Sequence, residues 1–592
     1  MMEGNKRSNA DFSHSNNEIV KKQKLEACPH ALKCYRRNPH HFKEYDHPHL
    51  NEFLETTSPK FPNSFKQEHT VYLEQLEILR ELKKIKLNAS QPVNIEQKEE
   101  AKPKTSRSVQ EVIKATTSSF FNKNKTTAHS HKNIVPNKMD LKGKKVLKNA
   151  KTMKEKLEIC APYNLFFTKV PEAAKTMNGY NCISFPDLIC PSIGILEKSL
   201  QLNFMIDVSW LIEQYQVHNL HTTPLTIVYG YDFPMMKEYI AKNLPNVTPH
   251  QVNLKDPFGI HHSKIGIYKF ENDIIRIVVS TANLYYEDWN HYNQGLWLSP
   301  PLSKMDAAKQ DFECAGPTGF KTDFLAYLKS YNLDVLRQWI EIIKRTDFSP
   351  IKVYFVSSIP GRHYPRNNGS HVHRVGDLLS KHCSLPVKTT PDSEGALSWG
   401  VIAQSSSLGS FGKSAGDWLR PVLLRALASH KNSVLPATPK ATLSLIYPTV
   451  KNVLGSHFGP QGGGCLPYGK SVNDKQKWLK EYLHVWKADT TGRSRAMPHI
   501  KSYVRVSPCM TKLAWCLITS ANISKAAWGG NSNRDGGTYI RSYEAGIMFL
   551  PHMFEEEYFY IERKEGDEGH LFPLMYDLPL EAYQSADEPW CN

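Results

Sequence analysis

His262-Ser263-Lys264, followed by Asn283, and His499-Ile500-Lys501, followed by Asn522, are two copies of one sparse motif in a chain of 592 residues. In both copies an apolar, β-rich stretch follows the Lys, and a second such stretch ends in a small-residue turn that carries the Asn. Side chains at positions i and i+2 of a strand project from the same face. Each copy therefore predicts an imidazole and an ammonium group directed at one spot.

The residue types in this pair of motifs suit the cleavage of a phosphodiester. Breaking a phosphodiester requires a nucleophile, an acid for the leaving oxygen and fixed positive charge for the phosphoryl oxygens. Two His-Lys-Asn sets supply all three, so the sequence predicts a phosphoryl-transfer centre that needs no catalytic cofactor or metal. A single His-x-Lys is usually a solvated strand edge, but its repetition with a matching Asn favours catalysis.

The motif resembles that of the phospholipase D superfamily, although the Asp usually found shortly after the Lys is missing from both copies. Longer stretches narrow the resemblance to eukaryotic tyrosyl-DNA phosphodiesterases over about residues 160 to 590. These stretches are Phe258-Gly259-Ile260-His261-His262, Gln294-Gly295, Ser406-Ser407-Leu408-Gly409-Ser410, Ala496-Met497-Pro498-His499-Ile500-Lys501, Thr519-Ser520-Ala521-Asn522-Ile523-Ser524-Lys525-Ala526-Ala527-Trp528-Gly529 and Ser542-Tyr543-Glu544-Ala545-Gly546.

The resemblance implies an α/β fold of two similar phospholipase-D-like halves related by pseudo-twofold symmetry. We expect the first half to cover 158–347 and the second to cover 348–592, with the active site between them. The implied reaction is hydrolysis of the 3′-phosphotyrosyl bond between DNA and a trapped topoisomerase I, and of other 3′-blocking adducts. It would proceed through a covalent phosphohistidine intermediate.

The resemblance also assigns roles to residues. His262 would be the nucleophile, and His499 would protonate the leaving phenolate and then activate water. An imidazole near its reference pKa of about 6.5 serves either role at neutral pH. Four side chains would bind the non-bridging oxygens, and two more would hold the histidines in the productive tautomer. The first set is Lys264, Lys501, Asn283 and Asn522, and the second is Gln294 and Glu544.

Three further residues match positions that bind DNA in the resembled family. Phe258 would stack on a base, with a core Phe as the equally weighted alternative. Ser407 and Ser410 lie in a Ser/Gly-rich loop suited to phosphate contacts. His261 is adjacent to His262, but on a strand it faces the other way, so we expect a packed or hydrogen-bonded histidine.

A second constellation lies near the N-terminus, where two Cys and two His follow one another closely. Cys28, Cys34, His41 and His47 would form a closed tetrahedral site for one structural zinc ion. His40 is the alternative to His41, although the spacing favours His41. A segment this short buries little core, so metal binding would stabilise its fold.

This segment resembles the poly(ADP-ribose)-binding zinc finger in its ligand spacing and in the run Cys34-Tyr35-Arg36-Arg37-Asn38-Pro39. The resemblance implies that Tyr35 stacks on adenine and that Arg36 holds phosphate. One departure is His30-Ala31, which stands where the family has an aromatic-Gly pair.

The remaining N-terminal sequence is polar and basic. Residues 1–23 read as a disordered tail whose Lys6-Arg7 and Lys21-Lys22-Gln23-Lys24 resemble a bipartite nuclear import signal. The finger would cover 24–50. We expect 51–157 to be a mostly disordered linker with one amphipathic helix near 71–87 that docks on a partner.

The net charge of +16 implies an anionic partner such as nucleic acid. No apolar run is long enough to span a bilayer, so we expect no membrane partner. We expect a nuclear monomer whose partners are DNA with a 3′-phosphotyrosyl end, a topoisomerase I-derived peptide and poly(ADP-ribose). Two alternatives are a phospholipase-D-type lipid phosphodiesterase, disfavoured by the basic N-terminal region, and a non-catalytic damage-binding scaffold, disfavoured by two complete half-sites.

Overall fold

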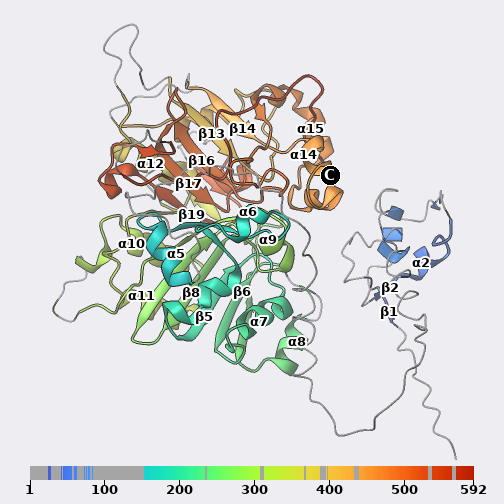
Figure 1. Cartoon of the computed structure of the whole chain (residues 1–592), viewed down its shortest axis with the longest axis horizontal. Coiled ribbons are helices and arrows are strands. Elements are labelled where there is room, and N and C mark those ends of the chain that lie inside the picture. Colours follow the sequence, from blue (N-terminus) through green and yellow to red (C-terminus); the bar gives the residue numbers. More distant parts are fainter. Residues whose placement is uncertain are drawn as a thin grey trace, which may run out of the picture. The chain divides into compact units, whose positions relative to one another are not determined.

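The chain divides into two compact units, Met1–Lys132 and Asn133–Asn592, which we describe separately in a computed structural model. The structure describes 25–28, 32, 42, 45–56, 59, 61–62, 72–73, 75–76, 78–80, 83 and 152–592 except 232, 234–235, 307, 309–312, 366–367, 387–394, 396–397, 432–438, 440, 531–536 and 563–568. Figure 1 shows the large unit as two sheets with surrounding helices. Among the described residues, no helix combines the length and apolarity needed to cross a membrane.

The first sheet of the large unit has eight strands in the order β4-β3-β10-β9-β8-β5-β6-β7. The strands in the run β3-β10-β9-β8-β5 pair antiparallel with one another. β4 pairs parallel with β3, and β5, β6 and β7 pair parallel along the other edge. The strands are β3 (Leu165–Thr168), β4 (Cys182–Ile183), β5 (Leu196–Asn203), β6 (Leu225–Tyr229), β7 (Val247–Gln251), β8 (Lys264–Phe270), β9 (Ile274–Ser280) and β10 (Gly295–Leu298).

The second sheet repeats this order. It runs β11-β19-β17-β16-β13-β14-β15, so each strand has a counterpart in the run β3-β10-β9-β8-β5-β6-β7, and β20 adds to β17. The strands are β11 (Tyr354–Ser358), β13 (Gly400–Gln404), β14 (Leu443–Ile446), β15 (Leu483–His484), β16 (Ser502–Val506), β17 (Lys512–Thr519), β19 (Glu544–Phe549) and β20 (Phe559–Tyr560). The prediction of two similar α/β halves is therefore confirmed.

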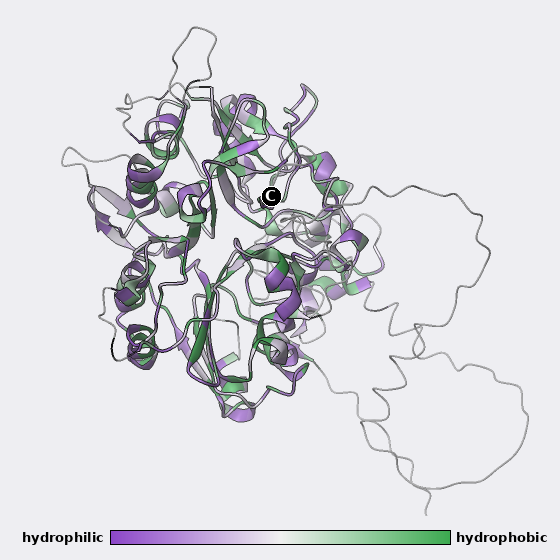
Figure 2. Cartoon of the chain, turned by 60° about the vertical axis from the view of Figure 1, so that its left-hand side comes forward, coloured by the Kyte–Doolittle hydropathy of each residue, from purple (hydrophilic) through white to green (hydrophobic). Residues whose placement is uncertain are grey.

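Alternation along the strands places helices on both faces of the first sheet. On β8, Ile265 and Ile267 belong to one core cluster, whereas Tyr268 and Phe270 belong to another. The first cluster includes residues of α10 (Phe320–Ser330) and α11 (Arg337–Lys344) and continues into the second half. The second includes residues of α5 (Met153–Cys160), α7 (Val208–Gln216) and α8 (Met236–Asn243). Figure 2 shows hydrophobic residues along the strands and hydrophilic residues on the outer helices.

Shorter elements complete the large unit. The helices are α6 (Ala174–Met177), α9 (Tyr286–Asn290), α12 (His371–His382), α13 (Arg425–Leu427), α14 (Val450–Leu454), α15 (Lys470–Lys475) and α16 (Lys525–Trp528). A separate two-stranded ribbon pairs β12 (Gly361–His363) with β18 (Thr538–Ile540). α5 begins at Met153, five residues before the expected boundary at 158, behind a capping box between Thr152 and Glu155.

The two halves meet through backbone pairing next to both motifs. His261 forms a parallel bridge with Tyr543, and Asn293 forms one with Pro498. The amide of His262 donates to the carbonyl of Tyr543 at 2.9 Å, and the amide of His499 donates to that of Asn293 at 3.0 Å. Each histidine is thus fixed by the half that does not contain it.

The small N-terminal unit is more than a finger followed by a linker. β1 (Glu26–Ala27) pairs with β2 (Tyr45–Asp46), and α2 (Pro48–Asn51) follows. Helical positions between 72 and 83 then bury Tyr72 and Leu76 in one core with Phe42 and Leu50. The expected helix is present, but its apolar face packs inside this unit instead of remaining available for a partner.

Arg80 shows why this helix packs there. Its guanidinium donates to the carbonyls of Phe53, Leu54 and Thr56, at 3.1, 2.8 and 2.5 Å. These carbonyls belong to the turns that follow α2, so Arg80 ties its helix to that segment. Described elements of the N-terminal unit therefore occur beyond residue 50, within the range predicted to be linker.

Candidate active site

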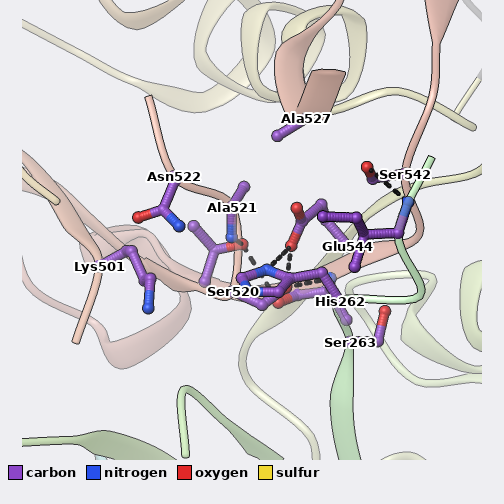
Figure 3. Close-up of polar contacts among 12 residues, drawn as sticks. His262, Ser263, Lys501, Ser520, Ala521, Asn522, Ala527, Ser542 and Glu544 are labelled. Atoms are coloured by element: carbon purple, nitrogen blue, oxygen red, sulfur yellow. Dashed lines mark hydrogen bonds and ion pairs between the residues drawn. The ribbon is translucent and has the colours of Figure 1, made fainter. Parts of the chain in front are cut away.

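His262 lies just before β8 and is oriented by a carboxylate from the second half. Its Nδ1 is 2.9 Å from Oε2 of Glu544, the first residue of β19, and the two side chains are 13% and 5% exposed. The hydroxyl of Ser520 donates to the same oxygen at 2.5 Å (Figure 3). A carboxylate only accepts, so Nδ1 carries the proton and Nε2 keeps its lone pair. This is the tautomer that a nucleophilic imidazole needs.

His499 is oriented in the corresponding way by the first half. Its Nδ1 lies 2.8 Å from the amide of Gln294, the residue before β10, and Thr281 donates to the oxygen of that amide at 2.8 Å. Thr281 and Gln294 correspond to Ser520 and Glu544 of the other half-site. A further contact has no counterpart there, because Oδ2 of Asp288 lies 3.1 Å from the same Nδ1.

The two contacts at Nδ1 of His499 decide its protonation. Asp288 is fully buried, and its Oδ2 also accepts the backbone N–H of Asn283. The carboxylate favours a proton on Nδ1, while the Nε2 of Gln294, whose oxygen accepts from Thr281, lies beside the same nitrogen. His499 is therefore held ready to carry a second proton on Nε2, which is the form of a general acid.

Burial opposes that second proton in the empty site. It lowers the pKa of His499 to about 4, with Lys501 and Lys264 acting in the same direction and Asp288 in the opposite one. Burial likewise lowers the pKa of His262, against the effect of Glu544. The pKa values of both imidazoles thus lie below the reference value of about 6.5. A bound phosphodiester would bring negative charge and raise both pKa values.

The two lysines form a buried pair of positive charges. Nζ of Lys264 donates to the carbonyl of His262 at 2.7 Å, and Nζ of Lys501 donates to that of His499 at 2.5 Å. Burial, together with the charge of Lys501, lowers the pKa of Lys264 to about 7, and burial lowers the pKa of Lys501 to about 8. Two buried like charges are costly without a counter-ion, so this arrangement favours an anion.

The two asparagines lie at the turns where their strands end. Oδ1 of Asn522 accepts from the hydroxyls of Ser405 and Ser406 and from the amide of Ser407, at 2.9, 3.1 and 3.1 Å. These bonds leave the NH₂ group of Asn522 as the donor toward a ligand, beside Lys501 (Figure 3). In the first half-site, Oδ1 of Asn283 is buried and has no hydrogen-bond partner among the described residues.

The structure brings together all eight residues predicted for catalysis. The predicted DNA contacts lie farther out: Phe258 is 74% exposed, Ser410 is exposed, and Ser407 donates its hydroxyl to the carbonyl of Pro467 at 3.1 Å. Phe258 is therefore not a core residue. His261 is buried and bonded to the hydroxyl of Tyr331 at 2.9 Å, as expected for a packed histidine.

Asp288 is the residue that sequence reasoning missed. We sought the superfamily's Asp shortly after each Lys, whereas this carboxylate follows Asn283 on α9 and reaches His499 of the other half. Its signal was an acidic residue among apolar and aromatic neighbours one turn beyond the motif Asn, in Tyr286-Glu287-Asp288-Trp289. Only the fold shows which histidine it serves.

The finger residues are described in part. Cys28 follows β1 and His47 follows β2, so the parallel pairing places these two buried residues side by side. Nδ1 of His47 lies 3.3 Å from the carbonyl of Tyr45. Both fit a zinc site. Cys34, His41, His40, Tyr35 and Arg36 lie outside the described residues.

Comparisons with known proteins agree with this geometry. The family described as tyrosyl-DNA phosphodiesterase matches residues 164–584, and the PBZ domain matches 25–50. Tyrosyl-DNA phosphodiesterase 1 of Drosophila melanogaster is 34% identical over 96% of this chain and 99% of the fly protein. The probable tyrosyl-DNA phosphodiesterase of Caenorhabditis elegans is 32% identical over 66% of this chain and 81% of its own length.

A solved structure, that of the yeast tyrosyl-DNA phosphodiesterase, has the same fold. It aligns with a TM-score of 0.55 and 21% identity over 72% of this chain and 99% of the yeast chain. The family match covers both half-sites and every element that positions them. This chain belongs to the tyrosyl-DNA phosphodiesterase family.

Proposed function

We propose that this phosphodiesterase hydrolyses the bond between a DNA 3′-phosphate and a tyrosine of topoisomerase I, through a covalent phosphohistidine on His262. The observation that carries the proposal is the crossed support of the two histidines. Glu544 of the second half orients His262, and Gln294 of the first half orients His499. Two positioned imidazoles beside two buried ammonium groups suit a two-step transfer of an anionic group.

In the first step, Nε2 of His262 attacks phosphorus. The N–P bond forms, the bond from phosphorus to the tyrosine oxygen breaks, and its electron pair stays on that oxygen. The proton on Nε2 of His499 moves to the leaving oxygen. Glu544 stabilises the positive charge that develops on the ring of His262, while Lys264 and Lys501 stabilise the phosphoryl oxygens.

In the second step, His499 acts in reverse. Its neutral Nε2 takes a proton from water, the water oxygen attacks phosphorus, and the N–P bond breaks with its electron pair returning to His262. The DNA 3′-phosphate leaves, and His499 is again protonated. Asp288 supports the charged form of His499 in both steps, because its carboxylate accepts from Nδ1.

The substrate class follows from the residues around the site. Phe258 offers an exposed ring four residues before His262, which suits stacking on a base near the 3′ end. The loop that carries Ser407 and Ser410 lies next to Asn522. It suits contacts to the DNA phosphate that adjoins the one at His262. Other 3′-blocking groups would enter the same site.

The reaction needs no metal in this proposal. Lys264 and Lys501 occupy the place where a divalent cation would otherwise neutralise the phosphoryl oxygens, and two ammonium groups would repel such a cation. Each nearby carboxylate is already engaged with a histidine. Excess EDTA would therefore leave cleavage unchanged, and activity that EDTA removes and Mg²⁺ restores would contradict the mechanism.

The N-terminal unit binds poly(ADP-ribose) in this proposal. Cys28 and His47, with Cys34 and His41, would hold one structural zinc ion, and Tyr35 and Arg36 would contact the polymer. The basic tail directs the enzyme to the nucleus, and the enzyme works there as a monomer. A nuclear reader of this polymer would bring the enzyme to damaged DNA.

The test of the activity is release of tyrosine from a single-stranded oligonucleotide with a 3′-phosphotyrosyl end. We expect product with a 3′-phosphate and none from a matched 5′-phosphotyrosyl control. Phosphatidylcholine vesicles serve as the lipid control. Hydrolysis of the lipid without the oligonucleotide would favour a lipid phosphodiesterase, and binding without any hydrolysis would favour a scaffold.

The test of the finger is polymer binding by fluorescence anisotropy. Cys28→Ala and His41→Ala should abolish binding, whereas Tyr35→Ala should weaken it and retain zinc. Leu76→Asp should also weaken it, because it disrupts the shared core of the N-terminal unit. Normal binding by the Cys28 variant would contradict the zinc-dependent reader.

A further inference from the structure

A row of exposed aromatic and arginine side chains begins at Phe258 and leads away from the motif residues. Most of this row lies on the two-stranded ribbon of β12 and β18, whose register pairs Arg362 with Tyr539. Tyr539 and Tyr364 are 50% and 44% exposed, so both aromatic rings are open to solvent. Single exposed aromatic residues are common on protein surfaces, but a contiguous row of exposed rings and cations indicates a binding surface.

Arg541 joins the first two rings. Its guanidinium carbon lies 5.5 Å from the ring centre of Phe258 and 6.0 Å from that of Tyr539. Both oxygens of Asp256 accept from its Nη1 at 3.1 Å, which fixes the guanidinium between the rings. The side chain remains 43% exposed. Phe258 and Tyr539 thus form one surface with a cation between them.

A second arginine repeats the arrangement on the neighbouring strand. The guanidinium carbon of Arg362 lies 5.8 Å from the ring centre of Tyr364. Since Arg362 is directly opposite Tyr539 in the ribbon, the order along the surface is Phe258, Arg541, Tyr539, Arg362 and Tyr364. Aromatic faces thus alternate with positive charges.

Few residues of chain separate the β12–β18 ribbon from the catalytic residues. Tyr539 is five residues before Glu544, and the backbone between them bonds to the segment that carries His262. Five extended residues span at most about 18 Å. Stacked nucleotides rise about 3.4 Å each, so Tyr539 lies within reach of roughly the first five nucleotides of a bound strand.

This alternation fits a single nucleic-acid strand. Bases of any sequence stack on aromatic faces, and phosphates between them pair with guanidinium groups. A duplex hides its base faces and would meet the arginines only.

We propose that the β12–β18 ribbon is a second DNA-binding surface, on which Tyr539 and Tyr364 stack the unpaired nucleotides that lie beyond the base held by Phe258. This inference rests on the proposed function, because it assumes a DNA 3′ end at His262. It makes the enzyme selective for ends with several unpaired nucleotides.

The test compares a 3′-phosphotyrosyl single-stranded 15-mer with the matching trimer, which is too short to reach the ribbon. Tyr539→Ala and Tyr364→Ala should each lower the ratio of kcat/KM values, 15-mer over trimer, about fivefold or more, and the double variant should lower it further. Tyr539→Phe keeps the stacking face and should keep the wild-type ratio. Tyr239→Ala, which removes an equally exposed tyrosine of α8, is the matched control.

The outcomes separate this inference from the proposed function. Wild-type ratios in both alanine variants would overturn the ribbon even if the 15-mer is cleaved. A lowered ratio only when the 15-mer is paired to a complementary strand would also overturn it, because stacking requires unpaired bases. Failure of the wild-type enzyme to cleave either oligonucleotide would instead overturn the proposed function.

Discussion

The two half-sites of this enzyme share one scaffold but surround their histidines with different charges. In both, a hydroxyl next to the motif Asn supports an oxygen from the start of a strand, and that side chain reaches the histidine of the opposite half. The supporting side chain is a carboxylate at His262, Glu544, and an amide at His499, Gln294. A carboxylate appears at His499 only through Asp288, which has no counterpart at His262.

This difference shows how a duplicated fold separates two chemical roles. A nucleophile benefits from a fixed tautomer and from a counter-charge once it is phosphorylated, which one carboxylate supplies. An acid that later becomes a base must exchange protons without being held in either form. An amide, which donates or accepts, combined with a carboxylate suits that second task.

The largest expected effect separates the two histidines. His262→Ala should lower turnover at least 10⁴-fold and form no enzyme–DNA adduct, because the nucleophile is gone. His499→Asn should retain some attack, since a phenolate leaves without full protonation, but should lack the base for hydrolysis. A covalent enzyme–DNA band should then accumulate on a denaturing gel. An adduct in the His262 variant alone would reverse the two roles.

The next test exchanges the supporting groups. Glu544→Gln removes the buried negative charge beside His262 and should lower kcat about 10²-fold or more. Gln294→Ala removes only a neutral contact at His499, where Asp288 remains, and should cost about tenfold or less. Circular dichroism would verify that both variants are folded. Equal losses would show that the charge at Nδ1 does not distinguish the half-sites.

Much of this site could be predicted from sequence because its parts repeat. In both copies the His precedes a strand, the Lys lies at or just before its first residue, and the Asn follows the next strand, so the repeated pattern identified Lys264 and Lys501 without the fold. The partners that cross between halves were less accessible. Gln294 and Glu544 came from the family resemblance, and Asp288 escaped because a helix following Asn283 carries it to a histidine far away in sequence.

The N-terminal unit illustrates a different limit. Periodicity indicated a helix near residues 71–87, and the structure has helical positions from 72 to 83. Composition suggested a linker, because the range 51–157 is rich in Lys, Ser, Thr and Asn, although apolar residues recur between 51 and 83. They nevertheless complete a core with Phe42 and Leu50, and Arg80 satisfies carbonyls that only the folded chain brings together. Sequence patterns do not show where such long-range contacts form.

A smaller effect would sharpen the role of Asp288. Its carboxylate raises the pKa of His499 against the lowering effect of burial, so Asp288→Asn should lower that pKa further. His499 must be protonated to act as the acid, and activity falls as pH rises through its pKa in the complex. The limb of the kcat–pH profile that falls with rising pH should therefore move to lower pH by about one unit. An unmoved limb with reduced kcat would make Asp288 a structural residue only.

The last test concerns the stability of the enzyme without substrate. Burial holds the pKa of His499 at about 4 in the folded state, below the ordinary value of 6.5 that it regains on unfolding. Between these values the unfolded chain binds more protons, so the stabilisation is present above pH 6.5 and is lost as pH falls toward 4. The full difference corresponds to about 3 kcal/mol.

In urea unfolding at pH 7 and pH 4.5, His499→Gln should lose less stability than wild type. The pKa of His262 is also lowered, so His262→Gln should flatten the dependence as well. A wild-type pH dependence in the His499 variant would mean that other buried groups, such as His261 and His371, account for the loss.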